Sequence, residues 1–373
     1  MTAAKQDDGV NIRLATAADA ERANAFHNAY YRTHRMRRQW EWEFCRGAAA
    51  DAALPFALAE FEGRVVGTQA LIVIDMVDRN GTFATAKSEE TLVDPSMRGR
   101  SLFARLYDPL LQYAQAAGVR SIWGFTPARS AFERAGFEVP ATTSQIARLL
   151  RAPGASALAE GRRKKPLQRG LAAAASVGLS LYAGLRASTA GVGASGIDLD
   201  VLDDSPSWAD DLTHRFVAQW GGVTIMRSQS YLRWRIFENP YVRPIFISAA
   251  HAGEPVGFAC LAMVENRVAM LVDIMAIDAR AGTVPAESTI AALLRTCVTR
   301  ARHMGAVALR GWSVTDHPFD LAVRRVARRL GWLHFRRGND MIYRILAGKP
   351  PGQARWSVDD WYISRIYTEG PSG

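Results

Sequence analysis

The chain has 373 residues, of which 49% are hydrophobic and 22% are charged, and its formal net charge is +10. This length favours two domains over one core, and the composition is ordinary for a soluble globular protein. The three cysteines are odd in number and lack metal-ligand spacing. They argue against a disulfide framework and suit a reducing cytoplasm.

The basic excess allows two interpretations: solvated arginines on helix faces, or an anionic ligand or surface. Basic clusters occur at Arg35–Arg38, at Arg162–Lys165 and at Arg324–Arg329. None of them is interleaved with aromatic residues that could stack on bases, so no nucleic-acid partner is expected.

Two segments bear on localisation. The N-terminus has no positive region followed by an apolar run, so we expect no secretory signal. The uncharged stretch Leu171–Leu185 is shorter than the roughly 20 apolar residues that a spanning helix needs. It predicts a packing helix in a connector, and the basic stretch before it allows weak contact with a membrane surface. We therefore expect a cytoplasmic protein without a transmembrane span.

The first half of the chain begins with a short predicted strand, "NIRLA". Thr16 then precedes a predicted helix as a plausible N-cap. The stretch around Trp40 and Trp42 predicts a second helix, in which we expect Trp42, like Trp234 later on, to be a core anchor. Alternating apolar residues around Gly63 indicate a hairpin, and a further strand follows over 83–93.

Apolar residues at helical spacing predict an amphipathic helix over Arg98–Ala117. "RSIWGF" then predicts a strand, "ARSAFERA" a helix, and "GFE" the opening of a last strand. Helices between the final strands imply a mixed sheet that is covered on both faces.

The same landmarks recur in the second half, in the same order. Trp42 pairs with Trp234 and Gly67 with Gly257, at offsets of 192 and 190 residues. "AAGVRSIWGF" pairs with "HMGAVALRGW", and "RAGFE" pairs with "RLGWL". A repeat of this length predicts that the fold occurs twice. We expect an N-terminal domain over 1–150, a helical and basic connector over 151–196, a C-terminal domain over 197–349 and an aromatic tail over 350–373.

One loop of the first half has the composition of a phosphate site. In "TLVDPSMRGRSLFARL" a strand ends at Val93, Pro95 breaks it, and "RGRS" opens the next helix. A helix N-terminus offers unpaired backbone N–H groups and the positive end of the dipole. Arg98 and Arg100 add charge, and Gly99 permits close approach of a ligand. Taken alone, the same pattern also fits an exposed basic cap.

The element order, together with this loop and "AFERAGFE", resembles the GNAT family of acyl-CoA-dependent N-acyltransferases. The resemblance implies an α/β (α+β) fold with two tandem GNAT-like domains, each a mixed, mostly antiparallel sheet flanked by helices. It also implies acetyl-CoA as co-substrate and no metal. The family's loop signature starts at Arg98, whereas Ser101 and Phe103 stand where the family usually has Gly and Gly or Ala. By this resemblance, the pyrophosphate and pantetheine of acetyl-CoA bind along Leu92, Val93, Arg98, Gly99, Arg100, Ser101, Leu102 and Phe103.

The second half departs from this pattern. At the matching place it has Gly282 and Pro285 but no Arg-Gly turn. Pro285 suits the first helical position. We therefore expect a degenerate second unit that kept the fold and lost the cofactor loop.

Glu89 and Glu90 are the candidate catalytic residues. They precede Val93 on the predicted strand, where the resemblance implies the acyl group, and a carboxylate there can deprotonate or hold an amine. An exposed charge pair is the alternative. Strand alternation predicts opposite faces for the two carboxylates, and Glu89 shares a face with Val93. Phe132 stands where many GNAT enzymes have a tyrosine acid.

The resulting hypothesis is an N-acetyltransferase that transfers acetyl from acetyl-CoA to a primary amine of a small molecule or amino sugar. A non-catalytic acyl-CoA-binding or scaffold protein is one alternative, supported by Ser101 and Phe132. Aminoacyl transfer from tRNA, as in tandem-GNAT peptidoglycan enzymes, is another, although the acyl-CoA loop argues against it.

Overall fold

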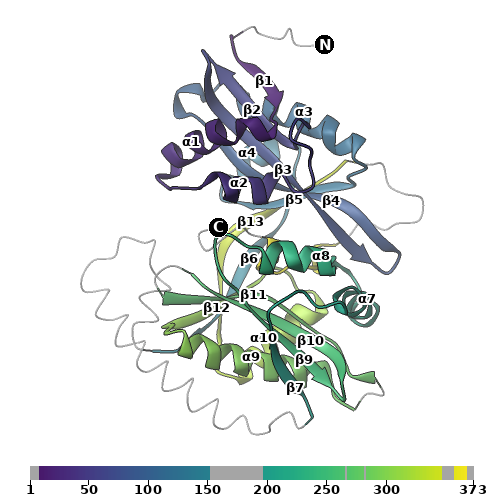
Figure 1. The fold of residues 1–373 in the computed structure, drawn as a ribbon. Helices are drawn as coiled ribbons and strands as arrows, with labels where there is room; N and C mark the ends of the chain where they lie inside the picture. Colours follow the sequence, from purple (N-terminus) through teal and green to yellow (C-terminus); the bar gives the residue numbers. More distant parts are fainter. Residues whose placement is uncertain (1–7, 152–195, 265–266, 281–282, 347–356, 368–373) are drawn as a thin grey trace. The chain divides into compact units, whose positions relative to one another are not determined.

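A computed structural model describes residues 8–151, 196–264, 267–280, 283–346 and 357–367 (Figure 1). Its internal contacts divide the chain into two compact units. The first unit takes its described residues from Met1–Met76, Phe83–Pro140 and Asp340–Ala354. The second takes them from Val77–Thr82, Ala141–Asn339 and Arg355–Gly373.

The elements of the first half follow the order predicted from the sequence. They are β1 (Asn11–Leu14), α1 (Ala20–Tyr31), α2 (Arg37–Phe44), β2 (Phe56–Phe61), β3 (Arg64–Asp78), β4 (Gly81–Val93), α3 (Leu102–Ala116), β5 (Ser121–Thr126), α4 (Arg129–Arg134) and β6 (Glu138–Leu149). Short 3₁₀ turns, Ala17–Asp19 and Pro95–Met97, precede α1 and α3.

Helices cover both faces of the first unit's sheet (Figure 1). On one face Phe56 of β2 contacts Trp40 and Phe44 of α2, with ring centroids 5.3 and 4.9 Å apart. On the other face the neighbouring Ala57 joins a buried cluster with Leu106 of α3. This alternation along β2 is what period-two patterning predicts. The prediction of a mixed sheet with two covered faces is confirmed.

Two local predictions about this unit need correction. The helix predicted over Arg98–Ala117 begins only at Leu102, because Gly99 and Ser101 have φ angles of +84° and +53°, which interrupt a right-handed helix. The buried aromatic anchor of α2 is Trp40, which is 0% exposed, whereas Trp42 is only half-buried. Trp234, which is the counterpart of Trp42 in the repeat, is buried as predicted.

The second half repeats the same order, which confirms the tandem repeat. Its elements are β7 (Asp198–Leu202), α7 (Ala209–Trp220), β8 (Val223–Ile225), α8 (Gln229–Leu232) with a π-helical turn over Arg233–Phe237, β9 (Ile245–His251), β10 (Glu254–Met263), β11 (Val268–Ala276), α9 (Ala286–His303), β12 (Ala308–Ser313), α10 (Pro318–Arg329), β13 (Leu333–Ile345) and β14 (Trp361–Tyr362). Even the hairpin turns match: Gly63 and Gly253 both have left-handed φ angles, +76° and +79°.

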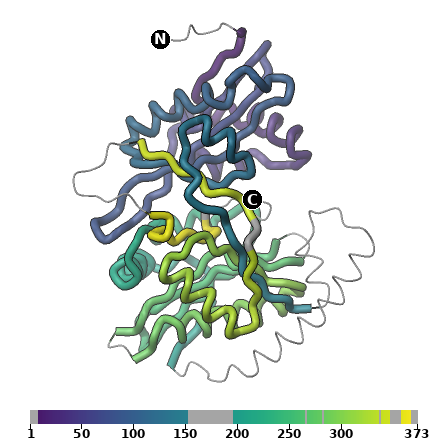
Figure 2. Tube along the Cα trace, turned by 180° about the vertical axis from the view of Figure 1, so that it is seen from behind, coloured from purple at the N-terminus to yellow at the C-terminus, as the bar shows by residue number. Residues whose placement is uncertain are grey.

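Each sheet is completed by a strand from the other half of the sequence. In the first unit the end of β13 pairs with β5, with Met341 opposite Phe125 and Ile342 opposite Gly124. Figure 2 shows this stretch of β13 running beside the strands of the first unit. In the second unit β6 pairs with β12, with Ile146 opposite Gly311. The two halves of the sequence therefore exchange their last strands.

Among the described helices, none is long and apolar enough to cross a membrane. The predicted connector helix at Leu171–Leu185 and the basic stretch at 162–165 lie outside the described residues.

The strand exchange predicts that residues 1–150 will not fold alone. This fragment lacks the β13 strand that pairs with β5, and Ile342, 1% exposed, is part of the first unit's core. We expect the fragment to be insoluble or to lack a cooperative unfolding transition. Fusing residues 333–346 to it through a flexible linker should restore cooperative unfolding, measured by circular dichroism in urea.

The matched control is the same fusion carrying Ile342→Asp, which places a charge in the core and should not rescue folding. A fragment 1–150 that unfolds cooperatively without the added strand contradicts this account.

Candidate functional site

In the first unit, strands β4 and β5 run in parallel but pair only briefly. The register joins Ala86 to Ile122 and Lys87 to Trp123, whereas β4 continues to Val93 and β5 to Thr126. Beyond Lys87 the two strands therefore have backbone N–H and C=O groups that are not paired with each other. The predicted site residues Glu89, Glu90 and Val93 all lie on this diverging part of β4.

The diverging part of β4 carries a backbone irregularity at Glu90, whose φ is +56°. Two buried side chains of β3 stabilise it: Thr68 donates to the carbonyl of Glu90 at 3.0 Å, and Gln69 Nε2 donates to the carbonyl of Glu89 at 3.0 Å. Ser88 contacts Tyr107 of α3 at 2.7 Å. Regular alternation would send Glu90 to that same face, but the left-handed residue turns its side chain toward α1 instead.

Glu90 is the centre of a buried polar cluster. Arg35 donates to both of its carboxylate oxygens, at 2.9 and 2.7 Å, and His27 Nδ1 lies 2.9 Å from one of them. Burial raises the pKa of Glu90, but the hydrogen bond from His27 and the charge of Arg35 outweigh it and leave the pKa below its ordinary value. Arg35 is itself held by Asn24, whose Oδ1 accepts from Nε at 2.6 Å.

Glu89 has a different environment. Its side chain is 23% exposed and forms an ion pair with Lys87, two residues earlier on the same strand. The two predicted carboxylates therefore differ in kind: Glu90 is buried and engaged by an arginine and a histidine, whereas Glu89 is partly exposed beside one lysine.

The predicted cofactor loop is exposed at its centre and anchored at its ends. Asp94 accepts from the backbone of Ser96 at 2.9 Å, while Arg98, Gly99, Arg100 and Ser101 are exposed. Leu92 and Leu102 point into the core, so they can offer a ligand only their backbone. Val93 and Phe103 are partly buried.

The N-terminus of α3 is open to a ligand. No hydrogen bond among the described residues engages the first backbone N–H groups of this helix; the first helical bond runs from Arg105 to the carbonyl of Ser101, at 3.2 Å. A β-carbon built on Gly99 would meet nothing within 4 Å. Unpaired N–H groups beside exposed arginines are the features that bind phosphate.

The matching helix of the second unit is closed. The backbone N–H of Ala286, the first residue of α9, donates to the carboxylate of Asp278 at 2.7 Å. The chain's own anion therefore occupies the position that a phosphate would take. Pro285, expected at the first helical position, is the N-cap residue.

Phe132, at the family's tyrosine position, is buried with its ring 5.0 Å from that of Phe103. The hydroxyl near it belongs to Tyr107, which contacts Ser88 and whose pKa burial raises. Sequence reasoning did not predict a role for Tyr107, because its position on α3 fits the apolar pattern of that helix.

The second unit contains a counterpart of the Arg35–Glu90 pair. Arg227 donates to Asp273 at 2.8 and 3.1 Å, and both side chains are 0% exposed. Arg35 and Arg227 each lie two residues before the second helix of their unit. β11 also has a bulge next to Asp273, where Leu261 pairs with Leu271 and the preceding Cys260 pairs with Asp273.

The packing around one glycine in each unit indicates that Glu90 and Asp273 occupy equivalent positions in the repeat. A β-carbon on Gly124 would lie 3.3 Å from the β-carbon of Ser88, and one on Gly311 would lie 3.3 Å from that of Leu271. Glu90 lies two residues after Ser88, and Asp273 lies two residues after Leu271. Sequence reasoning missed both pairs because none of their four residues lies within a landmark of the repeat.

Most of the basic clusters are neutralised locally. Arg325 and Arg329 both pair with Glu287, at 2.7 and 2.9 Å, and Arg37 pairs with Glu41 at 2.7 Å. These contacts fit the interpretation of solvated arginines on helix faces. The described residues contain no group of His, Cys, Asp and Glu side chains that could hold a metal ion.

Residues 11–139 match the model of the acetyltransferase (GNAT) domain family. The fold of the chain is similar to that of solved GNAT proteins, including a tandem one.

Similar solved structures show the same fold. They include GCN5-related N-acetyltransferases from Kribbella flavida (12% identity, TM-score 0.57, 90% of this chain and 71% of that one) and from Anabaena variabilis (11%, 0.57, 91% and 73%). A tandem GNAT protein from the clavulanic acid biosynthesis pathway is 17% identical, with a TM-score of 0.51 over 91% of this chain and all of that one. No curated protein matches the sequence.

The Arg35–Glu90 pair predicts a pH-dependent contribution to stability. Because the pKa of Glu90 is lowered in the folded state, the contribution is present above the carboxyl's unfolded pKa and is lost as pH falls through the folded value. Glu90→Gln should remove this acid sensitivity and, by leaving the buried Arg35 with only the more distant Glu43, lower the free energy of unfolding by about 3–5 kcal/mol at pH 7. Urea unfolding at pH 7 and at steps down to pH 4 measures both effects.

Glu41→Gln is the control, because it breaks an exposed pair within one helix turn, which is worth only about 0.3–0.5 kcal/mol. Equal losses in the two variants would mean that the buried pair does not stabilise the first unit.

Proposed function

We propose that the protein is an N-acetyltransferase that binds acetyl-CoA in the first unit and transfers its acetyl group to a primary amine. The observation that carries this proposal is the contrast between two equivalent helices: α3 begins with unpaired N–H groups beside exposed arginines, whereas α9 begins on Asp278. Only the first helix is prepared for the pyrophosphate of a nucleotide.

The remaining predicted residues fit the same substrate. The diverging edge of β4 at Leu92 and Val93 offers backbone groups that the amides of a pantetheine arm can pair with, as a strand would. Gly99, the glycine of the loop, leaves room for the phosphates to approach the backbone. Acetyl-CoA itself supplies an activated thioester, so the protein needs no metal for this reaction.

The chain's residues would orient the reactants and exchange protons. The N–H groups at the start of α3 hold the phosphates, and the edge of β4 directs the thioester toward the bulge at Glu90. An acceptor amine approaching this point has the partly exposed carboxylate of Glu89 nearby, which favours a cation. We infer that the acceptor is a small amine or amino sugar, with no nucleic-acid partner.

A non-catalytic acyl-CoA-binding protein is the second candidate. The buried Phe132 favours it, because no hydroxyl at that position can protonate the leaving thiolate. Binding of acetyl-CoA without turnover of any amine would support this candidate over the enzyme.

We infer a cytoplasmic location from the cysteines. All three are free thiols, and burial raises the pKa of Cys45 to about 11 and that of Cys297 to about 12. Such thiols are inert and suit a reducing compartment.

Acetyl-CoA should bind with a stoichiometry of one, and Arg98→Ala should weaken it. A lost charge-assisted hydrogen bond is worth roughly 1.5–3 kcal/mol, or about ten- to hundredfold in the dissociation constant. Titration calorimetry measures both quantities. At about 100 times its dissociation constant, acetyl-CoA should also raise the free energy of unfolding by roughly 2.7 kcal/mol.

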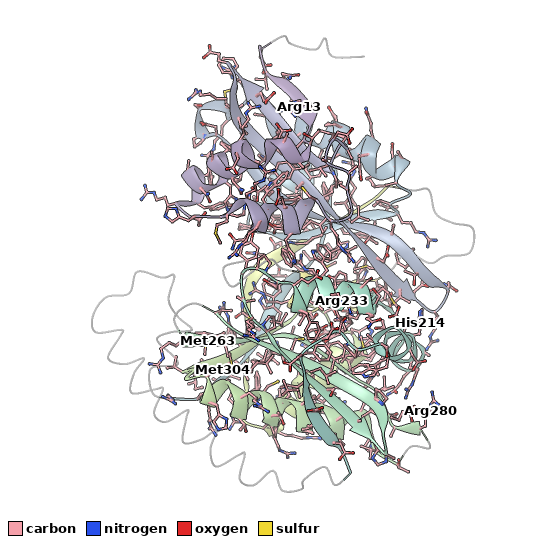
Figure 3. The ribbon with its side chains drawn as sticks, in the orientation of Figure 1. Arg13, His214, Arg233, Met263, Arg280 and Met304 are labelled. Atoms are coloured by element: carbon pink, nitrogen blue, oxygen red, sulfur yellow. The ribbon has the colours of Figure 1, made fainter. Side chains whose placement is uncertain are left out.

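Arg280→Ala is the matched control in the second unit. Arg280 is 72% exposed and lies near the start of α9, with its side chain directed outward (Figure 3). This variant should bind acetyl-CoA like the unchanged protein. Two binding sites, or equal losses in the two variants, would contradict a single cofactor loop in the first unit.

A further inference from the structure

His27 is the residue of the Glu90 cluster that reaches solvent. It lies on α1, and its side chain is 17% exposed, whereas those of Glu90 and Arg35 are each 5% exposed. Its ring lies 4.9 Å from that of Tyr31, one helix turn later. The cluster therefore presents an imidazole, and not a carboxylate, at its outer side.

The hydrogen bond to Glu90 determines the state of this imidazole. An ionised carboxylate only accepts hydrogen bonds, so Nδ1 must be the donor across the 2.9 Å contact. The neutral ring then has its lone pair on Nε2, and no hydrogen bond among the described residues engages that nitrogen. A partly exposed imidazole with one nitrogen held and the other available is the arrangement of a general base.

We propose that His27 is the general base that deprotonates the acceptor amine, and that Glu90 and Arg35 are positioning residues that hold its ring. This inference rests on the proposed function. Nε2 takes one proton from the acceptor ammonium, and the freed lone pair attacks the carbonyl carbon of the acetyl thioester. The carbon–sulfur bond breaks with its electron pair on sulfur. The second surplus proton of the attacking nitrogen passes to the thiolate, and His27 returns its proton to water.

The two carboxylates suit this step less well. Glu90 accepts from Arg35 through both oxygens, and its lowered pKa makes it a weak base. Glu89 forms an ion pair with Lys87, so its carboxylate is already engaged by a cation. An imidazole exchanges its proton in the neutral range, where a general base is most effective.

The second unit shows what closes the equivalent site. Its Arg227–Asp273 pair is covered by the chain's C-terminal segment, Trp361–Tyr367. Ser364 accepts from Arg227 at 3.2 Å, and Tyr362, whose ring lies 5.3 Å from the Arg227 guanidinium, donates to the carbonyl of Ile274. Arg365 covers the ring of Trp312 on β12 at 4.7 Å. In the second unit a buried tyrosine, Tyr362, 4% exposed, therefore lies beside the buried pair.

The charged and titratable groups around His27 are few. Glu90 on β4 and Arg35 after α1 contact it or its partner directly, and Tyr31 lies beside its ring. Glu43 of α2 lies 3.7 Å from Arg35. The carboxylate of Glu90 therefore holds the ring of His27 in place through Nδ1, and its removal should loosen that orientation.

The test measures acetyl-CoA binding by calorimetry and thiol release from acetyl-CoA with spermidine, glucosamine and a tripeptide as acceptors. His27→Gln keeps a side chain that can donate to Glu90 but cannot accept a proton. We expect unchanged acetyl-CoA affinity, a fall in kcat of about 10²- to 10⁴-fold, and loss of the acid limb of the pH profile of kcat/KM. Glu90→Gln should retain more activity than His27→Gln and should keep the acid limb, because it removes the positioning contact but not the base.

His34→Gln is the matched control, because His34 is exposed in the loop after α1, and Glu89→Gln tests the competing base. Full activity of His27→Gln with its acid limb intact overturns the assignment, as does loss of the limb in Glu89→Gln alone. Acetyl-CoA binding without thiol release for any of the three acceptors overturns the enzymatic function and the assignment with it. Failure to bind acetyl-CoA overturns the proposed cofactor site. Urea unfolding of each variant separates lost chemistry from lost folding.

Discussion

The site of the first unit depends on one buried ion pair, Arg35 with Glu90. A carboxylate placed below the surface of a sheet is stable only if its charge and its lone pairs are satisfied. Arg35 satisfies both oxygens of Glu90 at once and links the segment before α2 to strand β4. The pair thereby determines where β4 departs from its partner strand and where α1 presents His27. A substitution of either partner should therefore lower the stability of the fold first and affect the chemistry only through that loss.

The bulge explains why a sheet can hold this pair at all. With regular alternation, Ser88 and Glu90 would face α3 together, and the carboxylate would enter an apolar core that includes Leu106. The left-handed backbone at Glu90 avoids this, and hydrogen bonds from Thr68 and Gln69 of β3 stabilise that backbone conformation. The strained backbone, the turned side chain and the diverging strand edge are thus one local feature with three consequences.

Sequence patterns predicted what depends on periodicity and missed what depends on contacts between distant residues. The element order, the repeat and the open start of α3 follow from apolar spacing, glycines and the Arg-Gly turn. Alternation placed Glu89 and Glu90 on opposite faces and could not reveal the bulge, which requires Thr68 and Gln69 on another strand. Arg35 looked like one arginine of a surface cluster, and His27 like a polar residue of a helix. Their roles arise from residues 55 and 63 positions away.

The two units show how a repeat can separate folding from chemistry. Arg227 and Asp273 keep the buried pair, which the sheet of the second unit needs whether or not a ligand binds. The surrounding groups have changed in a consistent direction: Asp278 occupies the helix N-terminus, and Tyr362 and Ser364 cover the pair. Asp278 satisfies internally the kind of helix N-terminus that the first unit leaves open. An unsatisfied backbone N–H lowers stability and is retained only where a ligand completes it. The groups left open in the first unit are therefore the ones that we assign to substrate.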